Sequence, residues 1–152
     1  MALNIREVYA AVKTQLSVTG LTVCDLSDIP TTDQARRQPI LYPEPARTLV
    51  NVGVQDDSYG AGGSRRMTAS YTLMYTLLYR EAGTGRDIAD NIPGLVSLIA
   101  DILDAFLLLD SLGIDAVVDW NMTSTVTGYI QDAAGVLFHG ATLQIVVREF
   151  IN

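Results

Sequence analysis

The residues of this chain that could do chemistry are mostly aspartates, and several stand three residues apart. Neighbours at that spacing share one side of a helix, so Asp101 and Asp104 could hold a divalent cation between them. A cation site needs further oxygen ligands, and the sequence supplies no obvious ones. A solvent-exposed helix face is the simpler interpretation, and we expect no metal and no cofactor. The spaced pairs are Asp25/Asp28, Asp87/Asp90 and Asp101/Asp104.

Signals for nucleophilic or phosphate chemistry are weak. The glycine-rich stretch 60–64 lacks the Gly-Lys-Ser/Thr ending of a phosphate loop, and a hairpin turn explains it. His139 and Cys24 are the single histidine and cysteine, and both fall in predicted strands. A packed sheet residue is the simpler interpretation of each than a catalytic base or nucleophile. We therefore expect no enzyme.

Composition points toward assembly. The 152 residues carry 10 basic and 17 acidic side chains, a net charge of −7, which argues against a protein that grips nucleic-acid phosphates. Charged residues are 18% of the chain, against an ordinary value of about 25%, while apolar residues reach 49%. A surface this poor in charge predicts burial against other subunits.

Neither export nor a membrane span is expected. The first twenty residues carry Arg6, Glu7 and Lys13, unlike a secretory signal. The longest purely apolar run, 105–109, falls far short of the roughly 18 residues that cross a bilayer. We expect a protein made in a reducing compartment.

The elements in the first half of the chain follow from periodicity and turn residues. A helix is predicted from Asn4, with Asn4 and Glu7 as a reciprocal cap, until Gly20 stops the pattern. A short strand at 21–26 precedes a long loop at 27–47, which holds four of the five prolines. Residues 48–80 predict an extended β-hairpin arm, with alternating strands at 48–55 and 66–80. Because the second strand is long for a domain of this size, we expect the hairpin to protrude.

The second half predicts one helix and three strands. The helix spans about 90–111, with Pro93 in its first turn, and strands follow at 114–120, 125–131 and 136–150. Gly140 is a candidate bulge. The whole chain, 1–152, is therefore predicted to be a single α+β domain: two helices on one face of a mostly antiparallel or mixed sheet, with a protruding β-hairpin.

Charge is unevenly distributed along the sequence. Eight aspartates and no basic residue lie between Asp87 and Asp132, whereas seven arginines lie between Arg36 and Arg86. An acidic and a basic patch on one molecule suit a ring in which each subunit's arginines meet its neighbour's carboxylates. Ordinary scatter of surface charge is an equally good explanation.

In element order, length and character, ending in the sequence Leu-Gln-Ile-Val-Val-Arg-Glu-Phe at 143–150, the chain resembles the tail terminator (tail-completion) proteins of long-tailed bacteriophages, the minor tail protein U family. The resemblance implies a hexameric ring that caps the tail tube, ends tail elongation and meets a head-completion or connector protein. DNA would only pass through the channel, and the protein would belong to the virion tail or neck after assembly in the host cytoplasm.

The resemblance also implies places for the candidate site residues. The hairpin and the 27–47 loop would contact a neighbouring subunit or the tube, through Arg36, Arg37, Tyr59, Arg65, Arg66 and Arg80. Acidic residues would form a channel or ring surface, namely Asp87, Asp90, Asp101 and Asp104. Two alternatives stay open: another phage ring component, such as a head-closure or tail-tube protein, and a small ligand-binding or enzymatic α+β domain.

Overall fold

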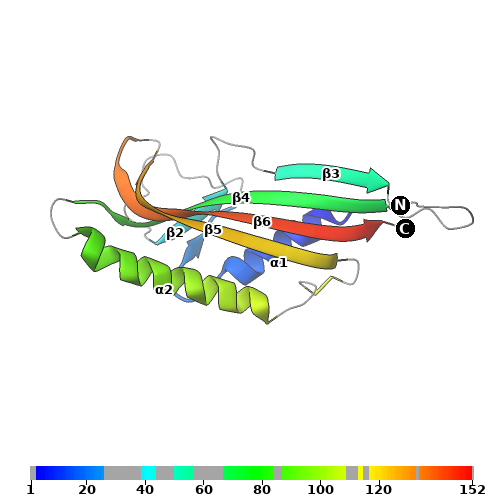
Figure 1. Cartoon of the computed structure of the whole chain (residues 1–152), viewed down its shortest axis with the longest axis horizontal. Helices are drawn as coiled ribbons and strands as arrows, with labels where there is room; N and C mark the ends of the chain where they lie inside the picture. The colour runs from blue at the N-terminus through cyan, green and yellow to red at the C-terminus, as the bar shows by residue number, and fades with distance from the viewer. Residues whose placement is uncertain are drawn as a thin grey trace, which may run out of the picture.

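A computed structural model describes residues 3–25, 39–43, 50–56, 67–83, 87–108, 113–114, 117–132 and 134–151. The α+β prediction is confirmed, with two helices and a six-stranded sheet forming an elongated molecule (Figure 1). The elements are α1 (Ile5–Leu16), β1 (Thr22–Val23), β2 (Ile40–Pro43), β3 (Val50–Asp56), β4 (Met67–Glu81), α2 (Asp87–Leu107), β5 (Val117–Gln131) and β6 (Leu137–Ile151).

The sheet is built around strands β4 and β6, which pair along almost their whole lengths. Its order is β1-β2-β4-β6-β5, and β3 pairs with the half of β4 that β2 leaves free. Among the described strands, only the short β1–β2 pair is parallel, and the other pairs are antiparallel. The predicted mostly antiparallel sheet is therefore confirmed.

The predicted hairpin at 48–80 forms as β3 and β4, but β4 is no separate arm. It lies inside the sheet, with β2 and β3 on one side and β6 on the other. The 15 residues of β4 fit within the sheet because the whole sheet is elongated (Figure 1). The prediction of a protruding arm is therefore wrong for the described part of the hairpin. The expected tip lies outside the described residues.

Strand β2 lies within the segment predicted to be a loop. Its four residues are all buried, and Ile40 and Leu41 pair with Leu78 and Leu77 of β4. The strand is flanked by Pro39 and ends at Pro43, and prolines predict a loop. Its four residues are too few to show a strand period, so the sequence did not indicate it. The rest of the predicted 27–47 loop lies outside the described residues.

Two other boundaries differ from the prediction. Residues 117–131 form one continuous strand, β5, where two were expected, because the pairing with β6 continues through the polar residues 121–125 between them. Helix α2 begins one turn earlier than predicted, at Asp87, and contains Pro93 in its second turn.

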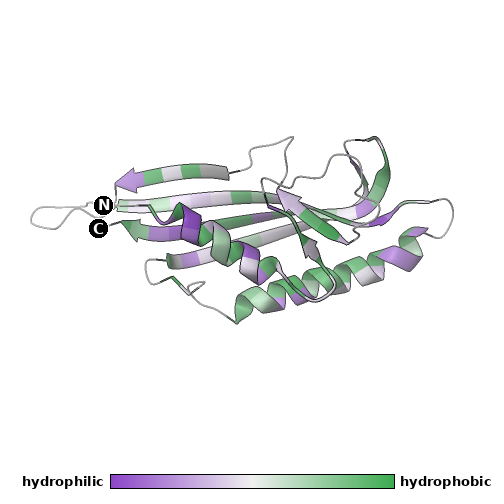
Figure 2. Cartoon of the chain, turned by 180° about the vertical axis from the view of Figure 1, so that it is seen from behind, coloured by the Kyte–Doolittle hydropathy of each residue, from purple (hydrophilic) through white to green (hydrophobic). Residues whose placement is uncertain are grey.

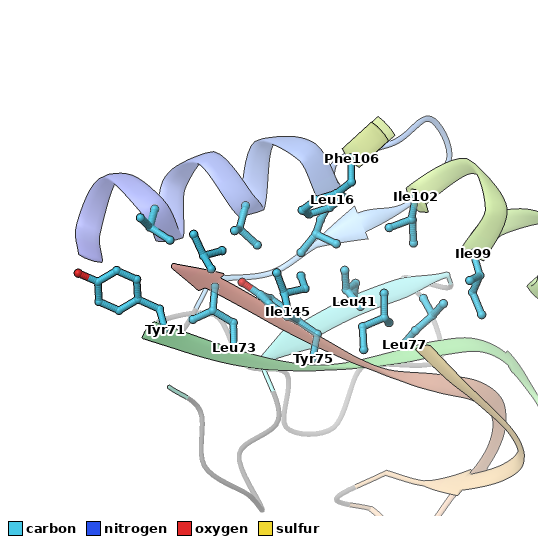
Figure 3. Packing of buried hydrophobic residues seen from close by; sticks show 14 of the residues in the cluster. Leu16, Leu41, Tyr71, Leu73, Tyr75, Leu77, Ile99, Ile102, Phe106 and Ile145 are labelled. Carbon is cyan, nitrogen blue, oxygen red and sulfur yellow. The ribbon is translucent and has the colours of Figure 1, made fainter. Parts of the chain in front are cut away.

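Both helices pack on the same face of the sheet, as predicted. Alternate residues of β4 and β6 face them, and the buried side chains form one cluster (Figure 3). Fully buried members with the largest side chains include Tyr71, Tyr75, Leu73, Leu77, Leu16, Ile102 and Phe106.

A smaller cluster lies on the opposite face, near the β5–β6 turn. Ile40 and Leu78, which pair across β2 and β4, contact Phe138 of β6 and Cys24 there. Cys24 is buried, which agrees with a packed core residue. The small cluster closes the end of the sheet where the β5–β6 hairpin curls in Figure 1.

Gly140 sits between two irregularities of pairing. The register shifts on β4 between Leu78 and Arg80, and on β5 between Thr127 and Ile130, both opposite the Phe138–Gly140 stretch of β6. The extra residues lie on β4 and β5. The pairing is therefore irregular at Gly140, as predicted, but the bulged residues belong to the two neighbouring strands and not to β6. A Cβ at Gly140 would lie 2.1 Å from the Leu77 carbonyl oxygen, so only glycine permits this close approach.

Candidate functional site

The predicted contact residues divide into two groups. Five of the six proposed for a subunit or tube contact lie outside the described residues, namely Arg36, Arg37, Tyr59, Arg65 and Arg66. Arg80 is described and is exposed at the end of β4. All four predicted acidic residues are described, and all lie on α2. Of the basic patch predicted from the sequence, the described structure therefore contains Arg80 among these candidates. Of the acidic patch, it contains the four α2 aspartates.

Arg80 lies near an α2 aspartate rather than apart from it. Arg80 and Asp101 both line a cleft of about 500 Å³, together with Tyr79 and Ser97. The Arg80 guanidinium carbon lies 5.5 Å from the centre of the Tyr79 ring, a cation–π distance. Its lining combines charged and hydroxyl groups with the Tyr79 ring, which could hold a small polar ligand.

Asp87 and His139 lie together at the start of α2. The Asp87 carboxylate accepts a hydrogen bond from the Gly83 amide and lies 3.7 Å from Nε2 of His139. His139 Nδ1 is 2.6 Å from the Gly128 carbonyl oxygen, so the ring joins β6 to β5 and to α2. His139 is fully buried in the sheet, as the simpler sequence interpretation held. Asp87 is therefore an anchor of the helix start rather than a free surface charge.

The other predicted aspartates are exposed. Asp90, Asp101 and Asp104 all face solvent on α2, in the helix layer that backs the sheet. Asp101 and Asp104 thus occupy the solvent-exposed helix face that the simpler interpretation predicted. Among the described residues, no three acidic, histidine or cysteine side chains gather as metal ligands.

The open face of the sheet is polar but nearly uncharged. Across β4, β5 and β6 it presents hydroxyl and amide side chains, and its ion pair joins Arg148 to Asp119. Since the α2 aspartates lie on the other side of the sheet, they cannot line the same surface as this face. The open-face side chains include Thr68, Ser70, Thr72, Asn121, Thr123, Thr125 and Gln144.

A buried carboxylate that the sequence analysis missed lies in the main core. Glu149 is fully buried, and its Oε1 accepts hydrogen bonds from the Tyr71 hydroxyl and, at 3.0 Å, from the Asn4 amide. Burial, followed by the hydrogen bond to Glu149, raises the pKa of Tyr71 above its ordinary range. A signal was present, since Glu149 stands at a core-facing position between Val147 and Ile151.

The predicted reciprocal cap of α1 is wrong. Asn4 makes no side-chain capping bond, because its backbone angles, φ −87° and ψ 28°, lie outside the extended region that a capping side chain needs. Glu149, from the far end of the chain, satisfies the Asn4 amide instead of Glu7. Tertiary structure thus supplies the cap that local sequence was expected to supply.

Large apolar side chains are exposed in two places: on the edge strand β3 and at the C-terminal end of α2. Val52 and Val54 of β3 are 40% and 50% exposed, and Leu107 and Leu108 at the end of α2 are 71% and 82% exposed. Figure 2 shows α1 lying across β4 and β6 and α2 beside β5, so no described helix covers β3. Exposed apolar side chains of this size are typical of association surfaces, and contact with other subunits stays a prediction.

Within the described residues, no helix is both long and apolar enough to cross a bilayer. Comparison with known protein families finds no family that matches the chain. Comparison with curated proteins finds no significant relative either.

Proposed function

We propose that this chain is a phage tail terminator, a structural virion protein that forms a ring of about six copies on the end of the tail tube. The ring would end tail elongation and join the tail to the head connector. The resemblance in element order motivates the proposal. The observation that supports it best is a pair of long edge strands, β3 and β5, each with one partner among the described strands and each carrying exposed apolar side chains.

The charge distribution favours one orientation of the subunit in such a ring. The open face, with hydroxyl and amide groups and a self-contained ion pair, offers few fixed charges to a passing polyanion. Helix α2, with four aspartates and no basic residue, lies behind the sheet. We therefore place the open face toward the DNA channel and α2 on the outer wall.

This function implies partners on both faces of the ring: the tail-tube protein on one and a head-completion or connector protein on the other. The location would be the virion tail or neck, after assembly in the host cytoplasm. No cofactor and no catalytic step enter the proposal.

The first experiment measures the mass of the purified chain by light scattering and images it by negative stain. A closed ring of about six subunits is expected. Long open tubes would favour a tail-tube protein, and a strict monomer at high concentration would count against the terminator. Adding the ring to the tube protein of the same phage then separates a terminator from a head-closure protein, because only a terminator stops tube growth.

A second candidate, binding of a small polar ligand, is favoured by the cleft that Arg80 and Asp101 line. The buried pair of Tyr71 and Glu149 would also suit a binding or enzymatic domain, but it does not line that cleft. Thermal-shift screening of small zwitterionic compounds tests this candidate. A stabilising compound whose effect is lost in both Arg80→Ala and Asp101→Ala would support it.

A further inference from the structure

Three strands each have one partner in the described structure: the two-residue β1, which pairs with β2, and the longer edge strands β3 and β5. Strand β3 pairs with β4 and strand β5 pairs with β6. An edge strand presents unpaired backbone N–H and C=O groups, and proteins commonly protect such edges with lysine or proline. Neither β3 nor β5 contains a lysine, an arginine or a proline. Both edges are therefore suited to pairing with another strand.

The directions of the two edge strands are complementary. Strand β3 is antiparallel to β4, β4 to β6, and β6 to β5, so β3 and β5 run in opposite directions. A second copy placed beyond β5 in the same orientation would present its β3 antiparallel to that edge. Pairing β5 with a second β5 would instead need a two-fold axis, and it would stop at a dimer.

The exposed valines of β3 lie on the same face of the sheet, and in the same rows of paired residues, as apolar side chains of β5. Following the pairing across the sheet, Val52, Tyr71, Val147 and Trp120 form one row on the helix-bearing face. The Phe106 ring packs 5.3 Å from the Trp120 ring, and the next residues along the chain are the exposed Leu107 and Leu108. Leu107 and Leu108 therefore follow directly on the residue that packs at the β5 end of this row. At its β3 end Val52 is 40% exposed, and no described helix lies over β3 in Figure 2.

Charge on the helix layer is complementary as well. Helix α2, beside the β5 edge, carries the exposed Asp90, Asp101 and Asp104 and no basic residue. Helix α1 carries Arg6, Glu7 and Lys13, and because Lys13 is paired with Asp25 of the same chain at 2.6 Å, Arg6 supplies the complementary charge. A neighbour added at the β5 edge would bring its α1 toward the acidic α2, which favours this orientation over one that sets two α2 helices side by side.

We propose that the β5 edge of one copy binds the β3 edge of a second copy as an antiparallel strand pair, with Leu107 and Leu108 of the first covering Val52 and Val54 of the second. This contact rests on the proposed ring and names the surfaces that build it. Because the two surfaces differ, every copy uses both, and repetition closes a ring or extends a filament.

Two double variants break one surface each. Val52→Lys with Val54→Lys alters the β3 side, and Leu107→Lys with Leu108→Lys alters the α2 side. All four positions are exposed in the single chain, so the lysines leave the fold intact, as circular dichroism would verify. Within the contact they would bury unpaired charge, and we expect association to weaken by on the order of tenfold or more. Ile88→Lys, at an exposed apolar position at the other end of α2, is the matched control.

The expected result is that each double variant alone is monomeric, that an equal mixture forms one-to-one heterodimers, and that Ile88→Lys assembles like the unaltered chain. The mixture is decisive because the β3 variant keeps an unaltered β5 and α2 surface, and the α2 variant keeps an unaltered β3 surface. These two unaltered surfaces can form one contact. If both double variants still form rings, the edge contact is wrong while the terminator function stands. If the unaltered chain forms filaments that both variants abolish, the contact stands and the terminator function falls. A two-fold dimer or a monomer of the unaltered chain would overturn the contact.

Discussion

The Tyr71 hydroxyl donates a hydrogen bond to Oε1 of Glu149, and both side chains are fully buried in the main core. The same oxygen accepts the Asn4 amide, so one carboxylate ties β4 and β6 to the start of α1. A buried polar group is tolerated where hydrogen bonds compensate its lost hydration, and Oε1 of Glu149 accepts two. Glu149 therefore fixes where the first helix docks on the sheet.

Removing the hydroxyl should destabilise the protein. In Tyr71→Phe, the Glu149 carboxylate loses a charge-assisted donor without gaining water, and we expect a loss of about 1–3 kcal/mol in the free energy of unfolding. Urea unfolding followed by circular dichroism measures it. Tyr129→Phe is the control, because the Tyr129 side chain is 53% exposed and its hydroxyl is hydrated in the folded protein. Its removal should be neutral or stabilising, and equal losses in both variants would argue against a specific role for the Tyr71 bond.

Stability should fall at alkaline pH. Burial and Glu149 raise the pKa of Tyr71, and burial and Tyr9 raise the pKa of Tyr75, whereas unfolded tyrosine ionises near pH 10. Above about pH 10 the unfolded chain therefore binds fewer protons than the folded one, so the free energy of unfolding decreases as pH rises. Each tyrosine contributes a slope of up to about 1.4 kcal/mol per pH unit.

Urea titrations at a series of alkaline pH values check this slope, with phenolate absorbance reporting ionisation. Below pH 9 these two tyrosines should contribute no pH dependence. Tyr71→Phe should reduce the slope of unfolding free energy against pH by up to about 1.4 kcal/mol per pH unit, the contribution of one proton. An unchanged slope in that variant would mean that Tyr71 ionises in the folded protein as it does in the unfolded chain.

Gly140 should tolerate no side chain. In Gly140→Ala the added Cβ would meet the Leu77 carbonyl oxygen at 2.1 Å, and backbone on a central strand cannot move aside cheaply. We expect a loss of about 1–3 kcal/mol or more in unfolding free energy, by thermal or urea unfolding. Gly128→Ala is the matched control on β5, where a Cβ meets nothing within 4 Å. Similar stability of the two variants would show that β4 and β6 do not approach as closely at Gly140.

Cys24 should be protected from thiol reagents in the folded protein. It is 2% exposed and packs in the smaller cluster, so its modification requires opening of that part of the structure. We expect slow labelling in buffer and rapid labelling in denaturing urea. Thr123→Cys combined with Cys24→Ala gives the exposed comparison, which should react quickly in both conditions. Fast labelling of the unaltered folded chain would contradict the burial of Cys24.

Periodicity predicted the elements that carry a long, regular pattern. Val8, Val12 and Leu16 repeat at helical spacing, and they are the buried residues of α1. Alternation over Tyr71, Leu73 and Tyr75 likewise identified β4 and the side that faces the helices. Such patterns can be read from sequence because one face of each element must be buried.

Short or nonlocal features could not be predicted in that way. Strand β2 has four residues, too few for a period, and it forms because β4 offers Leu77 and Leu78 as partners. The carboxylate that holds the start of α1 comes from a residue 145 positions away. The nearness of Arg80 and Asp101 also depends on how α2 crosses the sheet.

The sequence by itself determined the α+β class, the face of each long element that is buried and the shortage of surface charge, because hydrophobic periodicity and composition are local properties of the chain. Only the tertiary structure decided that β4 lies within the sheet instead of extending as an arm, and that Glu149 is buried. It also decided that β3 and β5 become the open edges. These features depend on which strands pair, and strand pairing is set by contacts between residues far apart in the sequence.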